Sequence, residues 1–264
     1  MFSKKNRKES LISVITVCLN AEGYIRQCLE SVIDQNFDDY EYIVIDGGST
    51  DNTWEIIKEY ENSLAYWHSK PDRGLSHAFN QGLEQANGKW IIFLNSDDYF
   101  ADSQVLNKCS SVLRTNPDQD VIFGQVQRVS RESEPKALDR PIGHPFNWKV
   151  FLKRNTIPHP SAFTNRDFFR RAGAFYEDYR FAMDYEFYLR GGKDLKAMFH
   201  PLIITCMREG GLSRANRRES LYECLRALNQ HQAWPGLYIL LYGNYLRFRN
   251  LFRDLLVKSR VISE

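Results

Sequence analysis

The sequence predicts an α/β fold, with a mainly parallel central sheet flanked by helices and a helical extension at the C-terminal end. In the first half of the chain, continuous apolar runs typical of strands covered on both faces alternate with segments of helical periodicity. Strands joined through helices of about 10–15 residues form right-handed crossovers and therefore a parallel sheet. From Ser220 onward the pattern is helical, with one interruption at Trp234-Pro235-Gly236.

Composition places the chain among ordinary globular proteins. With 264 residues, 43% of them hydrophobic and 26% charged, it can bury the core of one domain, and its formal net charge of +2 does not indicate nucleic-acid binding. The polar, basic opening MFSKKNRKES predicts no secretory signal, and no run reaches the roughly 18–20 apolar residues of a membrane-spanning helix. The five cysteines form no CxxC pair, which favours reduced thiols and a cytoplasmic location.

Four strands are expected in the first half, because each segment is apolar and rich in β-branched or aromatic residues: 11–19, 40–46, 64–70 and 89–95. Three helices are expected between them: 22–35, 50–61 with Thr50 or Asp51 as N-cap, and 74–88 with Gly88 as the terminating glycine. The second half is less regular. It predicts a helix (103–117), a strand with the alternation of antiparallel pairing (120–130), a charged, proline-rich loop (132–146), and a short strand, turn and amphipathic helix (158–192).

Polar side chains follow each strand of the first half: Asn20, Asp46, Asp72 and the pair Asp97-Asp98. Ligands of open parallel sheets bind at the carboxyl ends of the strands, so we predict one shared site there. A purely structural role is the alternative for these residues. Asp46 and Asp72 are ordinary turn residues, and the aspartate pair fits a solvated turn ahead of the next helix.

The site is predicted to bind a hard divalent cation. Mg²⁺ and Mn²⁺ bind one or two carboxylates together with substrate phosphates. The scattered histidines, without HExxH or paired cysteines, do not fit zinc. The first strand leads into LNAEGY, so neither a GxGxxG dinucleotide fold nor a P-loop is indicated.

Five segments, in order, resemble the family 2 glycosyltransferases with the GT-A fold: ISVITVCLNAEGYIRQCLESVIDQ, VIDGGSTDNT, SKPDRGLSHAFNQG, GKWIIFLNSDDYF and FAMDYEFYLR. Such enzymes move a sugar from a nucleoside diphosphate to an acceptor hydroxyl with inversion, usually with Mg²⁺ or Mn²⁺. The resemblance implies a basic N-terminal tail (1–10), a catalytic domain (11–213) and a basic amphipathic helical extension (214–264). Within the catalytic domain, residues 11–102 would form the Rossmann-like, nucleotide-sugar-binding half and residues 103–213 the acceptor-binding half.

Carried over by position, the resemblance implies a metal ligand at Asp98 and a set of donor-binding residues: Val17, Leu19, Asp46, Asp72 and Asp97. Asp97 would face the ribose. Two departures bear on these roles. Val-Cys-Leu-Asn replaces the Pro-Thr-Tyr-Asn of many relatives, which removes an aromatic side chain from the base pocket, and Asn95 replaces a further aspartate, which leaves the motif one charge poorer. A UDP-linked donor is the favoured expectation.

An inverting displacement also needs a base that takes the proton of the acceptor hydroxyl. The resemblance implies Asp184 for this role. Glu186 is the alternative, and because the two lie two residues apart on a helix, only one can face the site. His159, held between two prolines, is expected to contact the acceptor, with an ordinary surface or core histidine as the alternative.

The end of the chain is expected to contact a membrane. Residues 245–260 combine several arginines and lysines with an apolar stripe, as in helices that lie on anionic membranes. The alternative is a helix that packs on the catalytic domain or on a second subunit.

Together these features predict a metal-dependent, inverting hexosyl- or N-acetylhexosaminyltransferase. Its acceptor would be a glycan or a lipid-linked sugar in bacterial cell-surface polysaccharide or lipopolysaccharide assembly, at the cytoplasmic face of the membrane. A non-catalytic GT-A-like module that binds a partner is the first alternative. A nucleotidyltransferase is the second, although LNAEGY is not the glycine-rich, basic phosphate loop that such an enzyme would carry.

Overall fold

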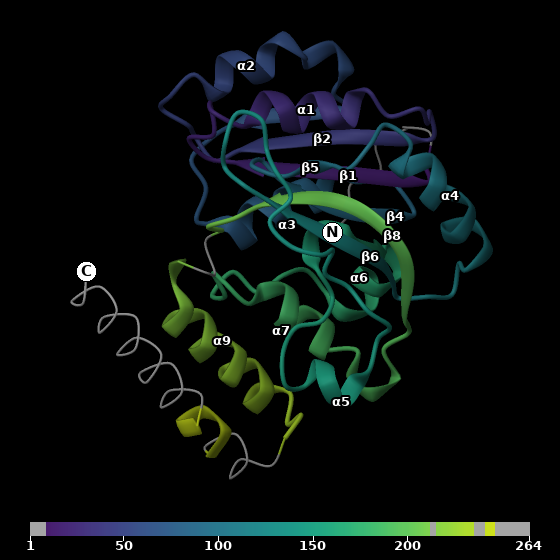
Figure 1. Cartoon of the computed structure of the whole chain (residues 1–264), viewed down its shortest axis with the longest axis vertical. Coiled ribbons are helices and arrows are strands. Elements are labelled where there is room, and N and C mark those ends of the chain that lie inside the picture. The colour runs from purple at the N-terminus through teal and green to yellow at the C-terminus, as the bar shows by residue number, and fades with distance from the viewer. Residues whose placement is uncertain (1–8, 212–214, 235–240, 246–264) are drawn as a thin grey trace.

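A computed structural model describes residues 9–211, 215–234 and 241–245 of the chain, and it has the α/β fold that the sequence predicts (Figure 1). Within these residues one sheet of eight strands has the order β3-β2-β1-β4-β7-β6-β8-β5. The strands are β1 (Ile12–Cys18), β2 (Tyr40–Asp46), β3 (Tyr66–Ser69), β4 (Trp90–Asn95), β5 (Tyr99–Phe100), β6 (Val121–Val129), β7 (Ala162–Asn165) and β8 (Ala197–Arg208).

Strands β1 to β4 form the parallel half of the sheet, as predicted. Strand β1 lies between β2 and β4, and β3 extends the sheet beyond β2. The register pairs Cys18 with Asp46, Asp46 with Ser69, and Val17 with Asn95. The four strands therefore end at the same level, on one edge of the sheet.

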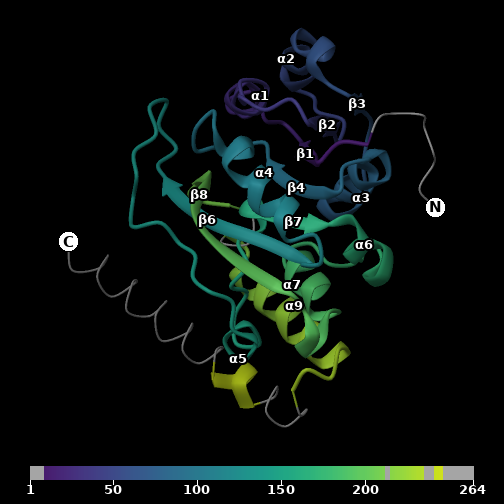
Figure 2. The same ribbon diagram turned by 90° about the vertical axis from the view of Figure 1, so that its right-hand side faces the viewer.

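Helices cover both faces of this sheet (Figure 2). They are α1 (Ile25–Ile33), α2 (Thr53–Glu59), α3 (Leu75–Gln85), α4 (Val105–Thr115), α5 (Trp148–Phe151), α6 (Arg166–Ala172), α7 (Met183–Leu189) and α9 (Arg217–Gln230). Because side chains alternate along a strand, Ile15 enters one hydrophobic core, with residues of α3, α6, α7 and α9. Val14 enters the other, with residues of α1, α2 and α4.

The second half of the sheet differs from the prediction at β8. Strand β6 pairs antiparallel with β7, as its alternation indicates, but it pairs along most of its length with β8, which is parallel to it. Strand β8 is not among the predicted elements. Its apolar residues form two short runs separated by His200 and Pro201, and a proline in a run argues against the interior of a strand.

The prediction that Gly88 terminates α3 is wrong. The helix ends at Gln85, and a Cβ at position 88 would lie only 2.4 Å from the backbone nitrogen of Ser13. Glycine is needed here because β1 approaches the backbone closely. The prediction of Thr50 or Asp51 as the N-cap of the next helix is also wrong, because Asn52 is the N-cap of α2. Asp51 still accepts a hydrogen bond from the backbone N–H of Thr53, the first residue of α2.

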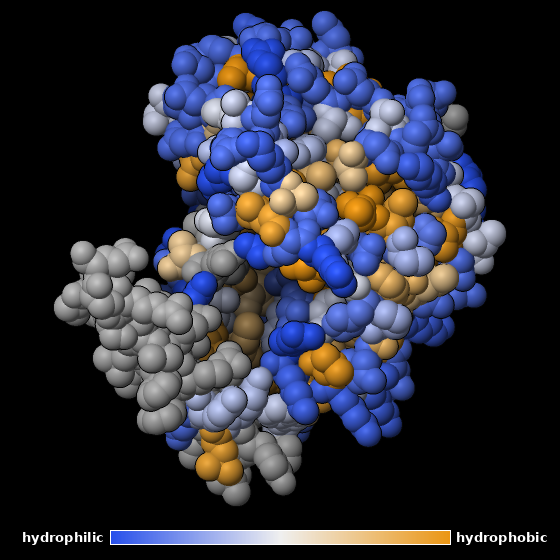
Figure 3. Space-filling model, in the orientation of Figure 1, coloured by the Kyte–Doolittle hydropathy of each residue, from blue (hydrophilic) through white to orange (hydrophobic). Residues whose placement is uncertain are grey.

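The described part of the chain contains no helix with the length and apolar character that crossing a membrane requires. Its surface in Figure 3 is hydrophilic over most of the upper part, and hydrophobic residues gather near the centre. The five cysteines are free, as predicted. Of the predicted membrane-contacting segment 245–260, only Tyr245 lies among the described residues, so that prediction falls outside them.

Candidate active site

The site is built at the edge where the four parallel strands end. The loops that follow β1 and β2 are joined there by Asn20, whose side-chain oxygen accepts a hydrogen bond from the backbone N–H of Thr50 (2.9 Å). The backbone N–H of Asn20 donates to the hydroxyl of Ser49 (2.8 Å). Asn20 has a φ of +50°, a conformation that asparagine tolerates better than most residues. The strand-end polar residues are thus brought together, as the sequence predicts.

Asp46 is completely buried at this edge. Its carboxylate accepts hydrogen bonds from the backbone N–H of Ser49 (3.1 Å) and from the hydroxyls of Ser49 (2.5 Å) and Ser69 (2.5 Å). These bonds join the turn after β2 to the end of β3. In this arrangement the carboxylate organises the loops of the site, and it is not exposed to a ligand as the predicted donor contact requires.

Asp72 reaches the same edge from the loop after β3. Its carboxylate lies directly over Gly47, because a Cβ on that glycine would be 2.4 Å from Asp72 Oδ2. The next residue, Gly48, has a φ of +88° and packs so closely that a Cβ would lie 2.9 Å from the nitrogen of Pro71. The two glycines therefore allow the 71–72 loop to close over the end of β2. This places Asp72 at the strand ends, where its predicted role requires it.

The two apolar residues predicted for the base pocket have different surroundings. Val17 is 4% exposed and belongs to the hydrophobic core that Ile15 also enters, so its side chain does not line an open surface. Leu19, just beyond the end of β1, is 57% exposed. Of these two residues, Leu19 is the one whose side chain can contact a ligand in this conformation.

The two aspartates after β4 differ in their burial, which the sequence does not show. Asp98 is 1% exposed, and its two carboxylate oxygens accept hydrogen bonds from the side-chain amide of Asn95 (2.9 Å) and the backbone N–H of Arg208 (3.1 Å). Burial, and then the negative charge of Asp97, raise the pKa of Asp98 above the usual range of an aspartic acid. Because this carboxylate is buried as well as bonded to protein donors, the geometry does not support the predicted direct ligation of a metal by Asp98.

Asp97 is the accessible member of the pair. Its side chain is 29% exposed and forms an ion pair with Arg131 (3.0 Å). Arg131 lies in the loop after β6 and also donates to the carbonyl oxygen of Glu209 (2.6 Å). The carboxylate of Asp97 therefore already holds a cationic group at the rim of the site.

A second arginine, Arg208, supports the backbone of the pair from the end of β8. It is 4% exposed, donates to the carbonyl oxygen of Asp97 (2.6 Å), and its guanidinium lies over the rings of Tyr24 (4.9 Å) and Tyr99 (5.2 Å). Sequence analysis missed Arg131 as a site residue. The available signal was the aspartate pair itself, since adjacent like charges require nearby cations.

Asp184 lies in the first turn of α7 and is partly buried. Its carboxylate accepts hydrogen bonds from the side-chain amide of Asn155 (2.7 Å) and from the backbone N–H of Tyr185 (2.8 Å). Burial raises the pKa of Asp184. The charge of His159 and these hydrogen bonds act in the opposite direction but do not cancel the effect.

His159 packs against the sheet. Its ring stacks on Phe93 of β4, with centroids 5.3 Å apart, and also packs against Phe79 and Phe175. Both ring nitrogens are buried and have no hydrogen-bond partner among the described residues. Burial lowers the pKa of His159, while the neighbouring charge of Asp184 raises it. His159 thus packs against β4 within reach of the charge of Asp184. A contact of His159 with an acceptor stays a prediction.

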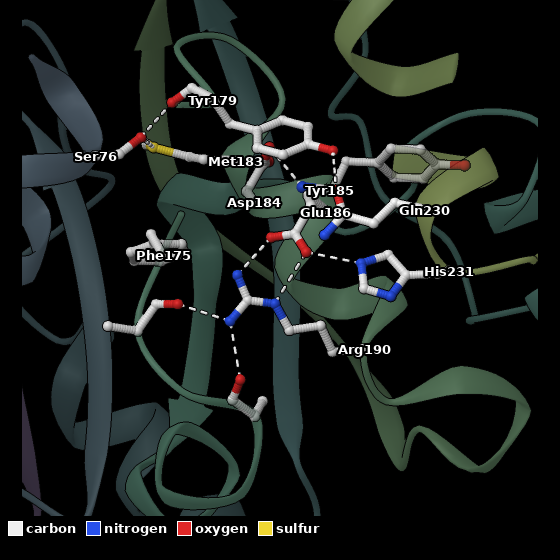
Figure 4. Close-up of polar contacts among 12 residues, drawn as sticks. Ser76, Phe175, Tyr179, Met183, Asp184, Tyr185, Glu186, Arg190, Gln230 and His231 are labelled. Carbon is white, nitrogen blue, oxygen red and sulfur yellow. Dashed lines mark hydrogen bonds and ion pairs between the residues drawn. The ribbon is translucent and has the colours of Figure 1, made fainter. Parts of the chain in front are cut away.

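Glu186, the alternative base, is held by neighbouring side chains in contacts that stabilise the fold (Figure 4). Its side chain is fully buried, forms an ion pair with Arg190 (2.5 Å) and is hydrogen-bonded to Nε2 of His231 (2.7 Å). Burial alone would raise the pKa of Glu186, but the hydrogen bonds from His231 and Arg190 outweigh it and lower the pKa. Arg190 in turn donates to the carbonyl oxygens of residues 172 and 174. Between the two carboxylates, this favours Asp184 as the one available for chemistry.

In the described ranges, no three or more His, Cys, Asp or Glu side chains are grouped so that they could hold a metal ion by themselves. A cation at Asp97 would therefore need further ligands from a bound molecule. This is the arrangement in which Mg²⁺ and Mn²⁺ are held by one or two carboxylates together with the phosphates of a substrate.

Comparison with known proteins gives a consistent picture. The family model described as glycosyl transferase family 2 matches residues 13–181. A PGL/p-HBAD biosynthesis glycosyltransferase of Mycobacterium bovis is 27% identical over 209 residues, covering 77% of this chain and 79% of that protein. An uncharacterized glycosyltransferase of Mycobacterium tuberculosis is 31% identical over 201 residues, covering 74% of this chain and 72% of that protein.

Solved structures share the fold at low sequence identity. Staphylococcus aureus TarS 1–349 in complex with UDP-GlcNAc has a TM-score of 0.64 and 19% identity, covering 82% of this chain and 66% of that chain. The mannosyltransferase PcManGT of Pyrobaculum calidifontis, in complex with GDP-Man and Mn²⁺, has a TM-score of 0.65 and 15% identity, covering 97% of this chain and 81% of that chain. The chain thus spans about two thirds of the TarS chain and most of the PcManGT chain.

The buried ion pair of Glu186 leads to a prediction about stability. Replacing Glu186 by Gln should lower the free energy of unfolding at pH 7 by about 3–5 kcal/mol, because Arg190 then loses its buried counter-charge. Glu186 has a lowered pKa in the folded state, so its contribution is fully present above the unfolded pKa of about 4.3 and is lost as the pH falls through the folded value. Urea denaturation of both proteins at pH 7 and at lower pH measures this.

The difference between the two proteins should accordingly shrink at acidic pH. Glu132→Gln is a matched control, because Glu132 pairs with Lys136 at the surface (3.7 Å) and should change the stability by less than about 1 kcal/mol. Equal urea midpoints for Glu186→Gln and the wild type at pH 7 would contradict the structural role of Glu186.

Proposed function

Because the chain belongs to glycosyltransferase family 2, we propose that it transfers a sugar, with inversion, from a nucleoside diphosphate sugar to an acceptor hydroxyl. One observation carries this proposal. Of the acidic residues assigned to the site, Asp72, Asp97 and Asp184 are partly exposed, while Asp46 and Asp98 are buried with both oxygens hydrogen-bonded. Partly exposed carboxylates with separate surroundings are what a donor contact and a general base require.

Asp184 serves as the base in this proposal. A base works best when its pKa lies near the working pH, and burial moves the pKa of Asp184 upward in that direction. The amide of Asn155 fixes one carboxylate oxygen, so the carboxylate is held in one orientation. In the transfer, Asp184 takes the proton of the acceptor hydroxyl as that oxygen bonds to the anomeric carbon and the bond to the diphosphate breaks.

The metal ligand in this proposal is Asp97 rather than Asp98. The site fits a divalent cation, because the carboxylate of Asp97 is exposed and already holds the positive charge of Arg131. Bound there, Mg²⁺ or Mn²⁺ would supply positive charge to the departing diphosphate. Asp98 fixes the turn that presents Asp97, through its bonds to Asn95 and Arg208. The presence of Mn²⁺ in the PcManGT complex is consistent with a metal in this fold.

The donor is proposed to carry UDP and a hexosyl or N-acetylhexosaminyl group. Support comes from the TarS structures with UDP and UDP-GlcNAc, while the GDP-Man complex of PcManGT marks the alternative nucleotide. Leu19 and Asp72 would contact the donor at the strand ends. The acceptor is proposed to be a glycan or lipid-linked sugar of a cell-surface polymer, assembled at the cytoplasmic face of the membrane. The mycobacterial relative named as a PGL/p-HBAD biosynthesis glycosyltransferase is consistent with a role in a biosynthetic pathway.

The assignment of the metal ligand predicts opposite results for the two neighbouring aspartates. Asp97→Ala should abolish the Mn²⁺-dependent part of UDP binding, since it removes the exposed carboxylate. Asp98→Asn should keep that binding, because the side-chain oxygen of asparagine can still accept a hydrogen bond from the backbone N–H of Arg208. Titration calorimetry with UDP, with and without Mn²⁺, measures both variants.

The same titration tests the proposed function as a whole. If the wild-type chain binds no nucleoside diphosphate in the presence of Mn²⁺, the glycosyltransferase proposal fails and a partner-binding module becomes the better account. If Asp98→Asn loses the metal-dependent binding and Asp97→Ala keeps it, the assignment of the ligand is wrong.

The role of Asp184 predicts a pH dependence. The base acts only when deprotonated, and its pKa is raised, so kcat should fall on the acid side at a pH above the ordinary aspartate value of about 3.9. Asn155→Ala should move this fall to still higher pH, because the lost hydrogen bond lowers the pKa of Asp184 in the wild type. Asp184→Asn should keep donor binding and lose transfer.

The measurement is the pH profile of kcat at saturating donor. Asn107→Ala is the matched control, since Asn107 is exposed on α4 and its side-chain amide donates to Gln104, the N-cap residue of that helix. An acid limb at the same pH in Asn155→Ala, Asn107→Ala and the wild type would argue against Asp184 as the base.

A further inference from the structure

The helix that carries Asp184 is supported by α9, which lies beyond the region matched by the family model. Figures 1 and 2 both show α9 running alongside α7. Helix α7 has only seven residues and no capping side chain of its own. The backbone N–H groups at its N-terminal end therefore need acceptors from elsewhere.

Glu223 of α9 provides acceptors for the N-cap residue of α7 and for the two residues before it. Its side chain is buried, and its two carboxylate oxygens accept hydrogen bonds from the backbone N–H groups of residues 180 (2.9 Å), 181 (2.8 Å) and 182 (2.9 Å). These are the three residues directly before Met183, the first residue of α7. A carboxylate at the N-terminal end of a helix also interacts favourably with the helix dipole. Asp184 follows only two residues after the last N–H that Glu223 holds.

Three more contacts join the end of α9 to the same region. Tyr179, just ahead of the capped residues, donates from its hydroxyl to the side-chain oxygen of Gln230 (3.0 Å), and the guanidinium of Arg226 lies 3.7 Å from its ring centroid. His231, the residue after α9, pairs with Glu186 in the middle of α7 (2.7 Å). Figure 4 shows Gln230 and His231 reaching these partners.

On the other side, helix α3 contacts the same loop. The hydroxyl of Ser76 donates to the carbonyl oxygen of Tyr179 (2.5 Å) and lies 2.9 Å from the sulfur of Met183. The segment ahead of Asp184 is thus held between α3, which belongs to the nucleotide-binding half, and α9. Glu223 is the only charged side chain among these described contacts that bonds directly to the backbone of residues 180–182.

We propose that Glu223 is a positioning residue for the transfer reaction: its carboxylate fixes the first turn of α7 and thereby the direction in which Asp184 presents its carboxylate. This inference rests on the proposed role of Asp184 as the base. The C-terminal extension would thereby contribute to catalysis through Glu223. A displacement of about 1 Å in a reacting group can lower a rate about 100-fold, so a loosened first turn is sufficient to impair transfer.

The prediction is a selective loss of turnover. Glu223→Ala should lower kcat by about 10- to 100-fold and leave the KM for the donor nearly unchanged, because the donor residues lie on the loops after the strands. Glu223→Gln should fall between this variant and the wild type, since its amide oxygen can still accept part of the hydrogen bonds. Glu219→Gln, an exposed position in the first turn of α9, is the matched control and should behave as the wild type.

Hydrogen exchange of the amides of residues 180–182 provides a readout that does not depend on activity. Their protection should fall in Glu223→Gln and stay unchanged in Glu219→Gln. Wild-type kcat in a folded Glu223→Gln or Glu223→Ala variant would overturn the proposal, as would equal losses in kcat and in the amount of protein that binds donor. If Glu223→Ala does not fold, Glu223→Gln decides. If the wild type turns over no donor, the proposed function fails instead, and the exchange measurement still tests whether Glu223 holds these amides.

Discussion

The register of the parallel strands is the constraint on which the rest of the site depends. Cys18, Asp46 and Ser69 are paired neighbours across β1, β2 and β3, and Asn95 of β4 lies one position from that line. Four loops therefore begin at one level. Because they begin together, Asn20 bonds to Ser49 and the 71–72 loop packs over the turn after β2, while the turn after β4 opens onto the same edge. A shift of one residue in any of these strands would turn its side chains to the other face of the sheet.

Burial then divides the acidic residues into two groups. Asp46, Asp98, Glu186 and Glu223 are buried, and each has partners that satisfy its oxygens. An unpaired charge in such places would be costly, so these residues hold loops and helices in place. Asp97 and Asp184 are the more accessible ones. The chemistry proposed for the molecule depends on these two, and their positions depend on the buried ones: Asp98 fixes the turn of Asp97, and Glu223 with Glu186 fixes the helix of Asp184.

The sequence predicts the parallel half of the fold well, because each of its strands is an apolar run and each ends in a polar residue. It also brings Asp184 to attention through the resemblance of its segment. What it does not predict depends on pairing between distant segments. Strand β8 has its apolar residues interrupted by His200 and Pro201, and it owes its position to its long pairing with β6. The two adjacent aspartates look alike in the sequence. Asp98 is the buried one because it bonds to groups that include the backbone N–H of Arg208, 110 residues away. The cap formed by Glu223 has the same origin, since the sequence around it reads as one face of an ordinary helix.

The central claim is that Asp97, and not Asp98, faces the bound nucleotide and its metal ion. A crystal structure of the chain with UDP and Mn²⁺ tests it most directly. The account predicts a carboxylate oxygen of Asp97 within about 2.0–2.2 Å of the metal, the range of first-row divalent cations with oxygen ligands, with Arg131 moved away and Asp98 still bonded to Asn95 and Arg208. A metal ion held by Asp98, with Asp97 still paired to Arg131, would contradict it.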